Sequence, residues 1–318
     1  MKRIWKEILC ALVMGMGLPW FVVGMGRAAI PPETTPPATE VTQQLSQPRQ
    51  VNVYIGNTVT QMPLTEYLTG VLLCELPGDF HMEAKKAQAV VARTYTLRTV
   101  TLKDKHPGNA VCTDPGCCQG YRSVEAYLAA GGSREAVQEA EAAVSQTEGQ
   151  VLTYAGQLID ATYFSCSGGQ TEDAVAVWGA EIPYLQSVSS PGEEQATHYT
   201  DTVTFTAQQF QSALGVKLSG KPATWLGTVT YTEGGGVDTM SIGGTVYKGT
   251  TLRAALGLRS TAFVMTAVGD SMVITTKGYG HRVGMSQYGA DAMAVSGCGF
   301  EEILIHYYQG AILTQMEN

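Results

Sequence analysis

The strongest periodic pattern in the chain lies between Leu64 and Arg98. Apolar side chains recur at Leu64, Leu68 and Leu72, the spacing that places residues on one face of an α-helix. Glu75 falls on that same face, where a core residue would be expected. A proline two residues later disfavours helical backbone angles in the residue before it, so the pattern predicts a helix that ends at about this glutamate.

A carboxyl group at the end of a partly buried helix is in an unusual environment. Partial burial disfavours the charged form of Glu75, and the negative end of the helix dipole disfavours it as well. Both effects raise the pKa of the carboxyl group, which prepares it to donate a proton near neutral pH. The alternative is a helix-end carboxylate that turns toward water.

A second, alanine-rich helix is predicted from about Met82 to Thr99. Lys86 and Arg93 lie on one of its faces, where small neighbouring residues allow another element to approach closely. The spacing leaves two interpretations open. Either these basic side chains are solvated or paired with a carboxylate, or they belong to a binding site. If Arg93 lies near Glu75, it lowers the pKa that burial raises.

The rest of the chain alternates between short strands and helices, so the predicted fold class is α+β, a mixed helical core with short strands. Two strands are expected on either side of Gly56–Asn57. From about residue 199 to residue 276, alternating apolar residues and many glycines predict a β-rich lobe, inserted or appended, with two short helices. Outside that lobe we expect strands at 150–154 and 157–164 and helices at about 133–147, 287–297 and 300–308.

The first 48 residues differ from the rest in composition. Basic residues precede an apolar run from about Ile8 to Met25, a pattern typical of a signal anchor and long enough to span a membrane. We therefore expect residues 1–26 to be a transmembrane anchor of a single-pass membrane protein whose folded part, residues 49–318, lies outside the cytoplasm. Residues 27–48 are rich in Pro, Thr, Glu and Gln, the composition of an extended linker.

Composition and charge narrow the range of partners. The chain has 318 residues, 44% of them hydrophobic and 15% charged, which is typical of a globular protein with a substantial core. Its formal net charge of -8 provides no basic excess to attract phosphates. The sequence therefore argues against non-specific nucleic-acid binding.

Histidine and cysteine crowd into one short loop after the second predicted helix. One imidazole and three thiols suit a closed tetrahedral zinc site, which is structural because no coordination position is left for water. A disulfide is the alternative, since the expected compartment is oxidising, although the chain has seven cysteines, an odd number. The candidate metal ligands are His106, Cys112, Cys117 and Cys118.

Two glycine-rich stretches carry further candidates. The first, residues 165–173, presents hydroxyl and amide groups beside Gly168–Gly169, although an ordinary glycine turn is the alternative. The second, residues 278–297, places a histidine between glycines and a capping serine at the start of a helix. With a tyrosine just before the first stretch, the candidates for substrate binding are Tyr163, Ser167, Gln170, His281, Gln287 and Tyr288.

Three parts of the chain together resemble a known family. They are EYLTGVLLCELPGDFHMEAKKAQAVVARTYTL at residues 66–97, YFSCSGGQTED at residues 163–173, and GHRVGMSQYGADAMA with ILIHYYQG between residues 280 and 310. In order and spacing they resemble the SpoIID/LytB domain family, the family of stage II sporulation protein D, over most of residues 51–314. The combination is highly specific, although no single segment would be.

The resemblance implies a peptidoglycan lytic transglycosylase that cleaves glycan strands between N-acetylmuramic acid and N-acetylglucosamine during sporulation, in the space between the two membranes that engulf the forespore. It implies that a partner amidase, sporulation protein P, first removes the stem peptides, and that the membrane protein sporulation protein M holds the pair together. It places the catalytic glutamate on Glu75 and the functional basic residues on Lys86 and Arg93. It also supports zinc at the cysteine-rich loop, where a cysteine replaces one histidine of the family pattern.

The chemistry of the residues agrees with this implication. A glycoside hydrolase usually needs two carboxylates, and the motifs offer one buried acid, Glu75. A lytic transglycosylase works with one acid, because the 6-hydroxyl of the sugar itself is the nucleophile. Two other classes stay open. One is a wall-binding protein that enhances an amidase without turnover, and the other is a zinc hydrolase, which would need an open metal site.

Overall fold

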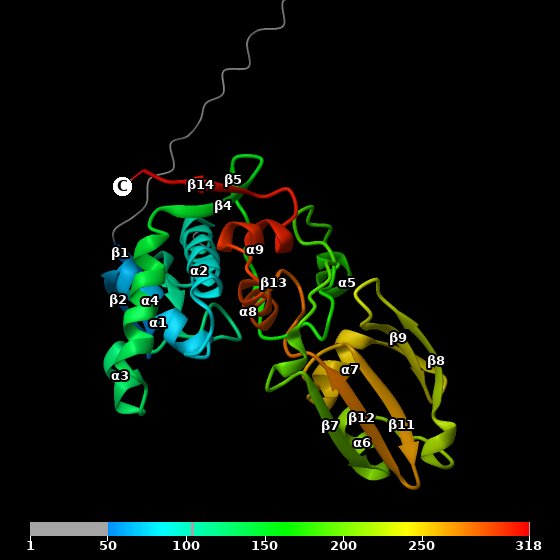
Figure 1. The fold of residues 1–318 in the computed structure, drawn as a ribbon. Coiled ribbons are helices and arrows are strands. Elements are labelled where there is room, and N and C mark those ends of the chain that lie inside the picture. The colour runs from blue at the N-terminus through cyan, green and yellow to red at the C-terminus, as the bar shows by residue number, and fades with distance from the viewer. Residues whose placement is uncertain (1–49, 103–104, 318) are drawn as a thin grey trace, which may run out of the picture. The chain divides into compact units, whose positions relative to one another are not determined.

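The computed structural model describes residues 50–102 and 105–317. The predicted anchor at residues 1–26 and the predicted linker at residues 27–48 lie outside these described residues. Within the described ranges, no helix is both long and apolar enough to cross a bilayer. The same ranges contain nine α-helices and several small sheets, so the predicted α+β class is confirmed for them (Figure 1).

The described chain begins with the hairpin and the helix that the sequence predicts. β1 (Gln50–Ile55) pairs antiparallel with β2 (Thr58–Pro63). α1 (Leu64–Glu75) follows directly. It ends where expected, because Leu76 precedes a proline and has extended backbone angles, with φ -111° and ψ 143°.

The long helix α2 (Met82–Leu102) contacts helices on both of its sides. Figure 1 shows it between α4 (Arg134–Gln146) on one side and α8 (Gln287–Val295) and α9 (Phe300–Tyr307) on the other. The two sides of α2 are buried in two different hydrophobic clusters, and alanines contribute to both. Small side chains allow close packing on each side, which accounts for the alanine-rich sequence of a helix that is covered all round.

Short strands connect these helices. β3 (Val111–Cys112) runs parallel to β1 and brings the cysteine-rich loop to the hairpin. β6 (Tyr163–Phe164) pairs in parallel with β13 (Met285–Ser286), so the two glycine-rich stretches meet. The other elements of this part are α3 (Val124–Ala129), β4 (Gln150–Tyr154), β5 (Gln157–Leu158), α5 (Ala174–Trp178) and β14 (Ile312–Gln315), with 3-10 turns at Pro107–Asn109 and Glu193–Gln195.

The single strand predicted at residues 157–164 is wrong, because the structure has two short strands there. β5 pairs with β4, whereas β6 pairs with β13, so the chain changes its partner between them. The backbone turns at Asp160, whose carbonyl accepts a hydrogen bond of 2.9 Å from the N–H of Thr162. A run of apolar residues does not reveal where a chain leaves one sheet for another.

Residues 200–277 form a β-rich lobe with its own hydrophobic cluster, which includes Phe210, Trp225 and Ile274. Its first and last strands, β7 (Thr200–Thr206) and β12 (Ser271–Lys277), are antiparallel neighbours (Figure 1). The chain therefore enters and leaves the lobe through adjacent strands, as an insertion does. The other elements of the lobe are α6 (Ala207–Leu214), β8 (Leu226–Tyr231), β9 (Val237–Ile242), β10 (Thr245–Lys248), α7 (Gly249–Leu256) and β11 (Phe263–Val268), with a 3-10 turn at Pro222–Thr224.

A buried ion pair joins the turn between β8 and β9 to the glycine-rich stretches. Nη1 of Arg282 lies 2.9 Å from the Glu172 carboxylate, and both side chains are almost fully buried. Arg282 also donates to the carbonyl of Gly234, and the N–H of Gly236 donates to Glu172. The contacts with Gly234 and Gly236 link the lobe to the rest of the fold, and the Arg282–Glu172 ion pair holds the two side chains that make them. Buried charges need several partners, and the turn between β8 and β9 supplies some of them.

Candidate active site and metal cluster

Glu75 lies half-buried at the carboxyl end of α1, with a backbone donor aimed at it. The N–H of Gly120 donates to its Oε1 at 2.5 Å. A Cβ atom at position 120 would come within 2.9 Å of the same oxygen and of the Cys74 sulfur. Only a glycine lets the loop backbone approach the carboxyl group this closely.

Burial is the largest influence on the Glu75 carboxyl group, and it raises the pKa. The N–H of Gly120, which donates to the carboxyl group, and the nearby side chains of Tyr163 and Gln287 lower the pKa, but the net shift is upward. Arg93 is not among the groups that shift this pKa. The carboxyl group therefore keeps its proton to a higher pH than an exposed glutamate does.

The tyrosine beside Glu75 belongs to a buried polar chain. The Tyr163 hydroxyl donates to Oε1 of Gln119 at 3.3 Å. Nε2 of Gln119 donates to Oγ1 of Thr96 at 2.9 Å and to the hydroxyl of Tyr67 at 3.4 Å. Sequence reasoning missed both Gln119 and Gly120, whose only signal was a glycine placed shortly after a pair of cysteines.

The start of α8 supplies the other neighbour of Glu75. Ser286 caps this helix by accepting from the N–H of Gly289, as predicted, and Gln287 follows in the first turn. Gln287 is only 6% exposed, and its Nε2 has no hydrogen-bond partner among the described residues. A buried donor without a partner costs about 1–3 kcal/mol, so this amide is ready for an acceptor on a ligand.

Two more predicted residues lie close by. Tyr288 packs edge-on against Phe80, with ring centroids 5.0 Å apart, and remains half-buried. His281 is packed between Phe164 and Trp178, with centroid distances of 5.6 and 5.5 Å. Burial lowers the pKa of His281 to about 4, and a backbone group of Tyr163 next to it only partly opposes that shift.

The indole of Trp178 is 43% exposed beside His281, an uncommon position for so large an apolar side chain. Trp178 is the last residue of α5, and Gly179 ends that helix in the left-handed conformation with φ 74°. Trp178 follows the first glycine-rich stretch in the sequence, and the structure places it against the histidine of the second.

Ser167 and Gln170 form hydrogen bonds within the structure around the first glycine-rich stretch. The hydroxyl and N–H of Ser167 both donate to Oε2 of Glu193, at 2.7 and 2.9 Å, and the N–H of Gly168 donates to the same oxygen at 2.8 Å. The other carboxylate oxygen accepts from Ser286 and Ser190. Nε2 of Gln170 donates to Ser187 at 3.0 Å.

Glu193 is thus a buried carboxylate, only 1% exposed, that joins the first glycine-rich stretch to the cap of α8. Sequence reasoning missed it, because it sits in an acidic turn that has the composition of a solvated one. The first glycine-rich stretch did indicate such a partner, because a serine followed by two glycines presents several backbone N–H groups that need a common acceptor.

Lys86 and Arg93 have partners other than Glu75. Lys86 forms an ion pair of 2.7 Å with Glu83, one turn earlier on α2. Arg93 is 1% exposed and donates to the carbonyls of Val144 and Gln150, at 3.0 and 3.1 Å. Burial lowers the pKa of Arg93 to about 10. In this arrangement Arg93 connects α2 to the end of α4 and to β4.

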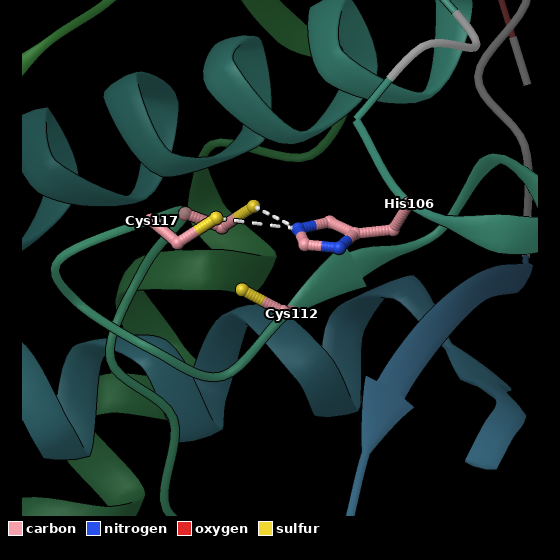
Figure 2. Close-up of side chains that lie close together, drawn as sticks. His106, Cys112 and Cys117 are labelled. Carbon is pink, nitrogen blue, oxygen red and sulfur yellow. Dashed lines mark hydrogen bonds between the residues drawn. The ribbon is translucent and has the colours of Figure 1, made fainter. Parts of the chain in front are cut away.

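The four predicted metal ligands are gathered in one place. The donor atoms of His106, Cys112, Cys117 and Cys118 all lie within 4.8 Å of one another. Nε2 of His106 is 3.4 Å from the sulfurs of both Cys117 and Cys118. Figure 2 shows the Cys112 sulfur directed toward the space between His106 and Cys117. None of the six described cysteines forms a disulfide.

The cluster and Glu75 are connected through four consecutive residues. Cys117 and Cys118 end the cluster, Gln119 contacts Tyr163, and Gly120 contacts the carboxyl group. The position of the cysteine-rich loop therefore determines where two of the groups around Glu75 lie.

Comparison with known proteins identifies the family. The chain is 40% identical over 292 residues to stage II sporulation protein D of Bacillus subtilis (strain 168), covering 89% of this chain and 84% of the relative. The chain belongs to the stage II sporulation protein D family. The family model described as stage II sporulation protein matches residues 55–154.

Two further relatives extend the comparison. The chain is 40% identical over 278 residues to stage II sporulation protein D of Bacillus amyloliquefaciens, covering 85% of this chain and 80% of the relative. It is 30% identical over 305 residues to an amidase enhancer of Bacillus subtilis (strain 168), covering 78% of this chain but 40% of that relative. The segment matched by the family model contains Glu75, Gly120 and all four candidate metal ligands.

Proposed function

We propose that this member of the stage II sporulation protein D family is a peptidoglycan lytic transglycosylase with Glu75 as its acid. One observation carries the proposal. Glu75 is a half-buried acid whose pKa is raised, and the described groups around its carboxyl are the N–H of Gly120, Tyr163 and Gln287 rather than a second acid. A hydrolase of the usual kind needs a second carboxylate close by, whereas a transglycosylase that uses an internal nucleophile does not.

In the proposed reaction, protonated Glu75 donates its proton to the glycosidic oxygen between N-acetylmuramic acid and N-acetylglucosamine, and the bond from C1 to that oxygen breaks. The ionised carboxylate then accepts the proton of the 6-hydroxyl on the muramic acid, whose oxygen forms a bond to C1. The product ends in a 1,6-anhydro ring, Glu75 regains its proton, and no water is consumed.

The neighbours of Glu75 have separate tasks in this reaction. The N–H of Gly120 and the hydroxyl of Tyr163 stabilise the carboxylate after its proton has left. The unpartnered amide of Gln287 donates to an acceptor on the sugar, and neutral His281 with exposed Trp178 extends the binding surface. Lys86 and Arg93 act on this site only through the position of α2, since their side chains have other partners.

The donor set of the cysteine-rich loop fits a structural zinc ion. Three sulfurs and one imidazole nitrogen within 4.8 Å of one another would hold Zn²⁺ with no position left for water. When bound, the ion would supply folding stability and fix the loop. It would not supply a nucleophile. The site is therefore expected to hold the loop beside Glu75 in place, and it does not favour a zinc hydrolase. The ligands would be His106, Cys112, Cys117 and Cys118.

The setting of the reaction is also a proposal. The family and the sequence of residues 1–26 support a single-pass membrane protein whose folded part faces the cell wall during engulfment. Its substrate would be glycan strands from which an amidase, sporulation protein P, has removed the stem peptides. Sporulation protein M would hold the two enzymes at the membrane.

A second candidate function is a non-catalytic, wall-binding enhancer of an N-acetylmuramoyl-L-alanine amidase. The similarity to a protein named amidase enhancer favours it. In that case the surface around His281 and Trp178 would bind glycan, and Glu75 would be a binding residue.

The decisive experiment compares products released from denuded, purified glycan by the wild type, by Glu75→Gln and by Glu66→Gln. Glu66 is an exposed glutamate on the same helix, so its variant is the matched control. Mass spectrometry should find anhydro-muramyl products with the wild type and with Glu66→Gln but none with Glu75→Gln. Products from Glu75→Gln would refute the role of this acid. A wild type that makes none but stimulates an amidase would establish the second candidate.

A further inference from the structure

Gln119 is an almost fully buried amide, 1% exposed, that lies between Tyr163 and two hydroxyl groups of the core. Its Oε1 accepts from the Tyr163 hydroxyl at 3.3 Å. On its other side, Nε2 donates to Thr96 at 2.9 Å and to Tyr67 at 3.4 Å. Every atom of the amide that can form a hydrogen bond is therefore in use.

The hydroxyl of Thr96 fixes which end of the amide faces Tyr163. Its single hydrogen is donated to the carbonyl of Ala92, one turn earlier on α2, at 2.7 Å. Toward Gln119 the hydroxyl can then only accept, so the amide must present nitrogen to Thr96 and oxygen to Tyr163. Gln119 is thus an acceptor, and not a donor, where it meets the tyrosine.

Tyr163 has one hydroxyl hydrogen and two acceptors that compete for it. One acceptor is Oε1 of Gln119, to which the hydroxyl donates in the structure, and the other is the Glu75 carboxyl group, which lies close enough for Tyr163 to lower its pKa. While Glu75 is protonated it is a neutral and weak acceptor, and the hydrogen goes to Gln119. Once Glu75 is ionised, the charged acceptor is the stronger of the two, and the hydrogen goes to the carboxylate.

We propose that Gln119 is a positioning residue of the proposed active site, which holds the Tyr163 hydroxyl hydrogen while Glu75 is protonated and releases it to the carboxylate after proton transfer. The residue touches neither the substrate nor Glu75 and acts only through Tyr163. The inference rests on the proposed function for the reaction that it serves, but the exchange of the hydrogen takes place in the free protein as well.

The exchange has a definite sign. When Glu75 is ionised, Tyr163 must give up its hydrogen bond to Gln119 in order to donate to the carboxylate. When Glu75 is protonated, that hydrogen bond is kept. The acceptor on Gln119 therefore favours the protonated form of Glu75 and raises its pKa. The groups that face Glu75 are Cys74 on α1, the N–H of Gly120, Tyr163 on β6 and the neutral amide of Gln287 on α8. Arg122 faces Cys74, and the tyrosines Tyr67 and Tyr95 face Tyr163. Of these groups, only Tyr163 has a hydrogen with two acceptors.

The test uses two substitutions with opposite expected effects. Gln119→Leu removes the competing acceptor, so Tyr163 donates to Glu75 permanently and the pKa of Glu75 falls. Tyr163→Phe removes the donor, so the pKa of Glu75 rises. Each shift should be about one pH unit, the size expected when a hydrogen bond to a charged group is gained or lost. The double variant should behave like Tyr163→Phe alone, since the side-chain amide of Gln119 acts on Glu75 through the Tyr163 hydroxyl.

Two readouts separate this inference from the proposed function. The first is the alkaline limb of the pH profile of kcat/KM on denuded glycan, which should move to lower pH in Gln119→Leu and to higher pH in Tyr163→Phe. The second is the carbon NMR titration of the Glu75 carboxyl group in the full chain without substrate, assigned with Glu75→Gln. If the wild type does not cleave glycan, the proposed function fails, and the titration still decides the inference.

Because Gln119→Leu removes the hydrogen bonds that the amide donates to Thr96 and Tyr67 in the core, a milder variant accompanies it. Thr96→Val keeps Gln119 but frees its amide to turn, so the titration should again move to lower pH. Tyr67→Phe removes a partner on the far side of the amide and should leave the titration unchanged. The inference is overturned if Gln119→Leu and Thr96→Val titrate like the wild type while Tyr163→Phe shifts, or if the double variant differs from Tyr163→Phe.

Discussion

The backbone N–H of Gly120 donates a hydrogen bond of 2.5 Å to the carboxyl group of Glu75, across 45 residues of sequence. This contact joins the end of a helix to the end of the cysteine-rich loop. It also determines what the loop can contain, because a side chain at position 120 has no room beside the acid.

The first prediction concerns this glycine. Gly120→Ala should displace the loop from Glu75, because its Cβ would lie 2.9 Å from Oε1 and from the sulfur of Cys74. We expect a loss of about 1–3 kcal/mol in the free energy of unfolding and a fall in kcat on the order of tenfold to a hundredfold. Urea unfolding and product release measure the two. Gly116→Ala, in the same loop, meets only the flexible side chain of Asp114 and is the control.

The second prediction concerns the four candidate zinc ligands of the cysteine-rich loop. Cys118→Ser should lower the zinc content of the purified protein, measured by atomic absorption, and lower its Tm, because binding energy to the native state is lost. The expected loss of stability is on the order of several kcal/mol. Cys298→Ser removes a cysteine outside the cluster and should change neither quantity. Zinc-free protein with an unchanged Tm in chelator would contradict the prediction.

The third prediction concerns pH and His281, whose pKa is lowered to about 4 by burial. In the unfolded chain its pKa is about 6.5, so between these values the unfolded state binds the proton more readily than the folded state does. This residue should therefore make the protein less stable as the pH falls from about 6.5 to about 4, by up to about 3 kcal/mol, and have no effect at higher pH.

Urea unfolding at pH 7 and at pH 5 tests this effect. His281→Gln should reduce the loss of stability between the two pH values. An equal loss in the wild type and in His281→Gln would show that the histidine is solvated in the native protein.

The fourth prediction concerns Trp178. Because its indole is 43% exposed, Trp178→Ala should change the Tm little, but it should raise KM for glycan about threefold to tenfold with a small change in kcat. Tyr231→Ala removes an aromatic side chain that is 59% exposed in the lobe and serves as the control. An unchanged KM would place the glycan on another surface.

Local rules were enough to predict the helix that carries the acid. The apolar spacing from Leu64 onward and the proline after Leu76 determine where α1 begins and ends, and both depend only on nearby residues. The cluster of His106 with three cysteines was predictable for the same reason, since all four residues lie in one loop. The strand that breaks into β5 and β6 was not, because its two halves pair with different distant partners.

The groups around Glu75 could not be derived from periodicity. Gly120 and Gln287 approach the carboxyl group from other parts of the chain, and only the tertiary packing of α1, α2 and α8 brings them there. Lys86 and Arg93 show the opposite limit. Their helical spacing predicts a shared face, but spacing does not reveal which acceptors lie opposite each of them.

The helix α2 lines two hydrophobic clusters at once, one with α8 and α9 and one with α1 and β1. Neither cluster can persist after the other has melted, because each depends on the same turns of backbone. These two parts of the molecule should consequently unfold in a single cooperative step. A fragment that ends before α8 and α9 would expose to solvent the side of α2 that these helices cover.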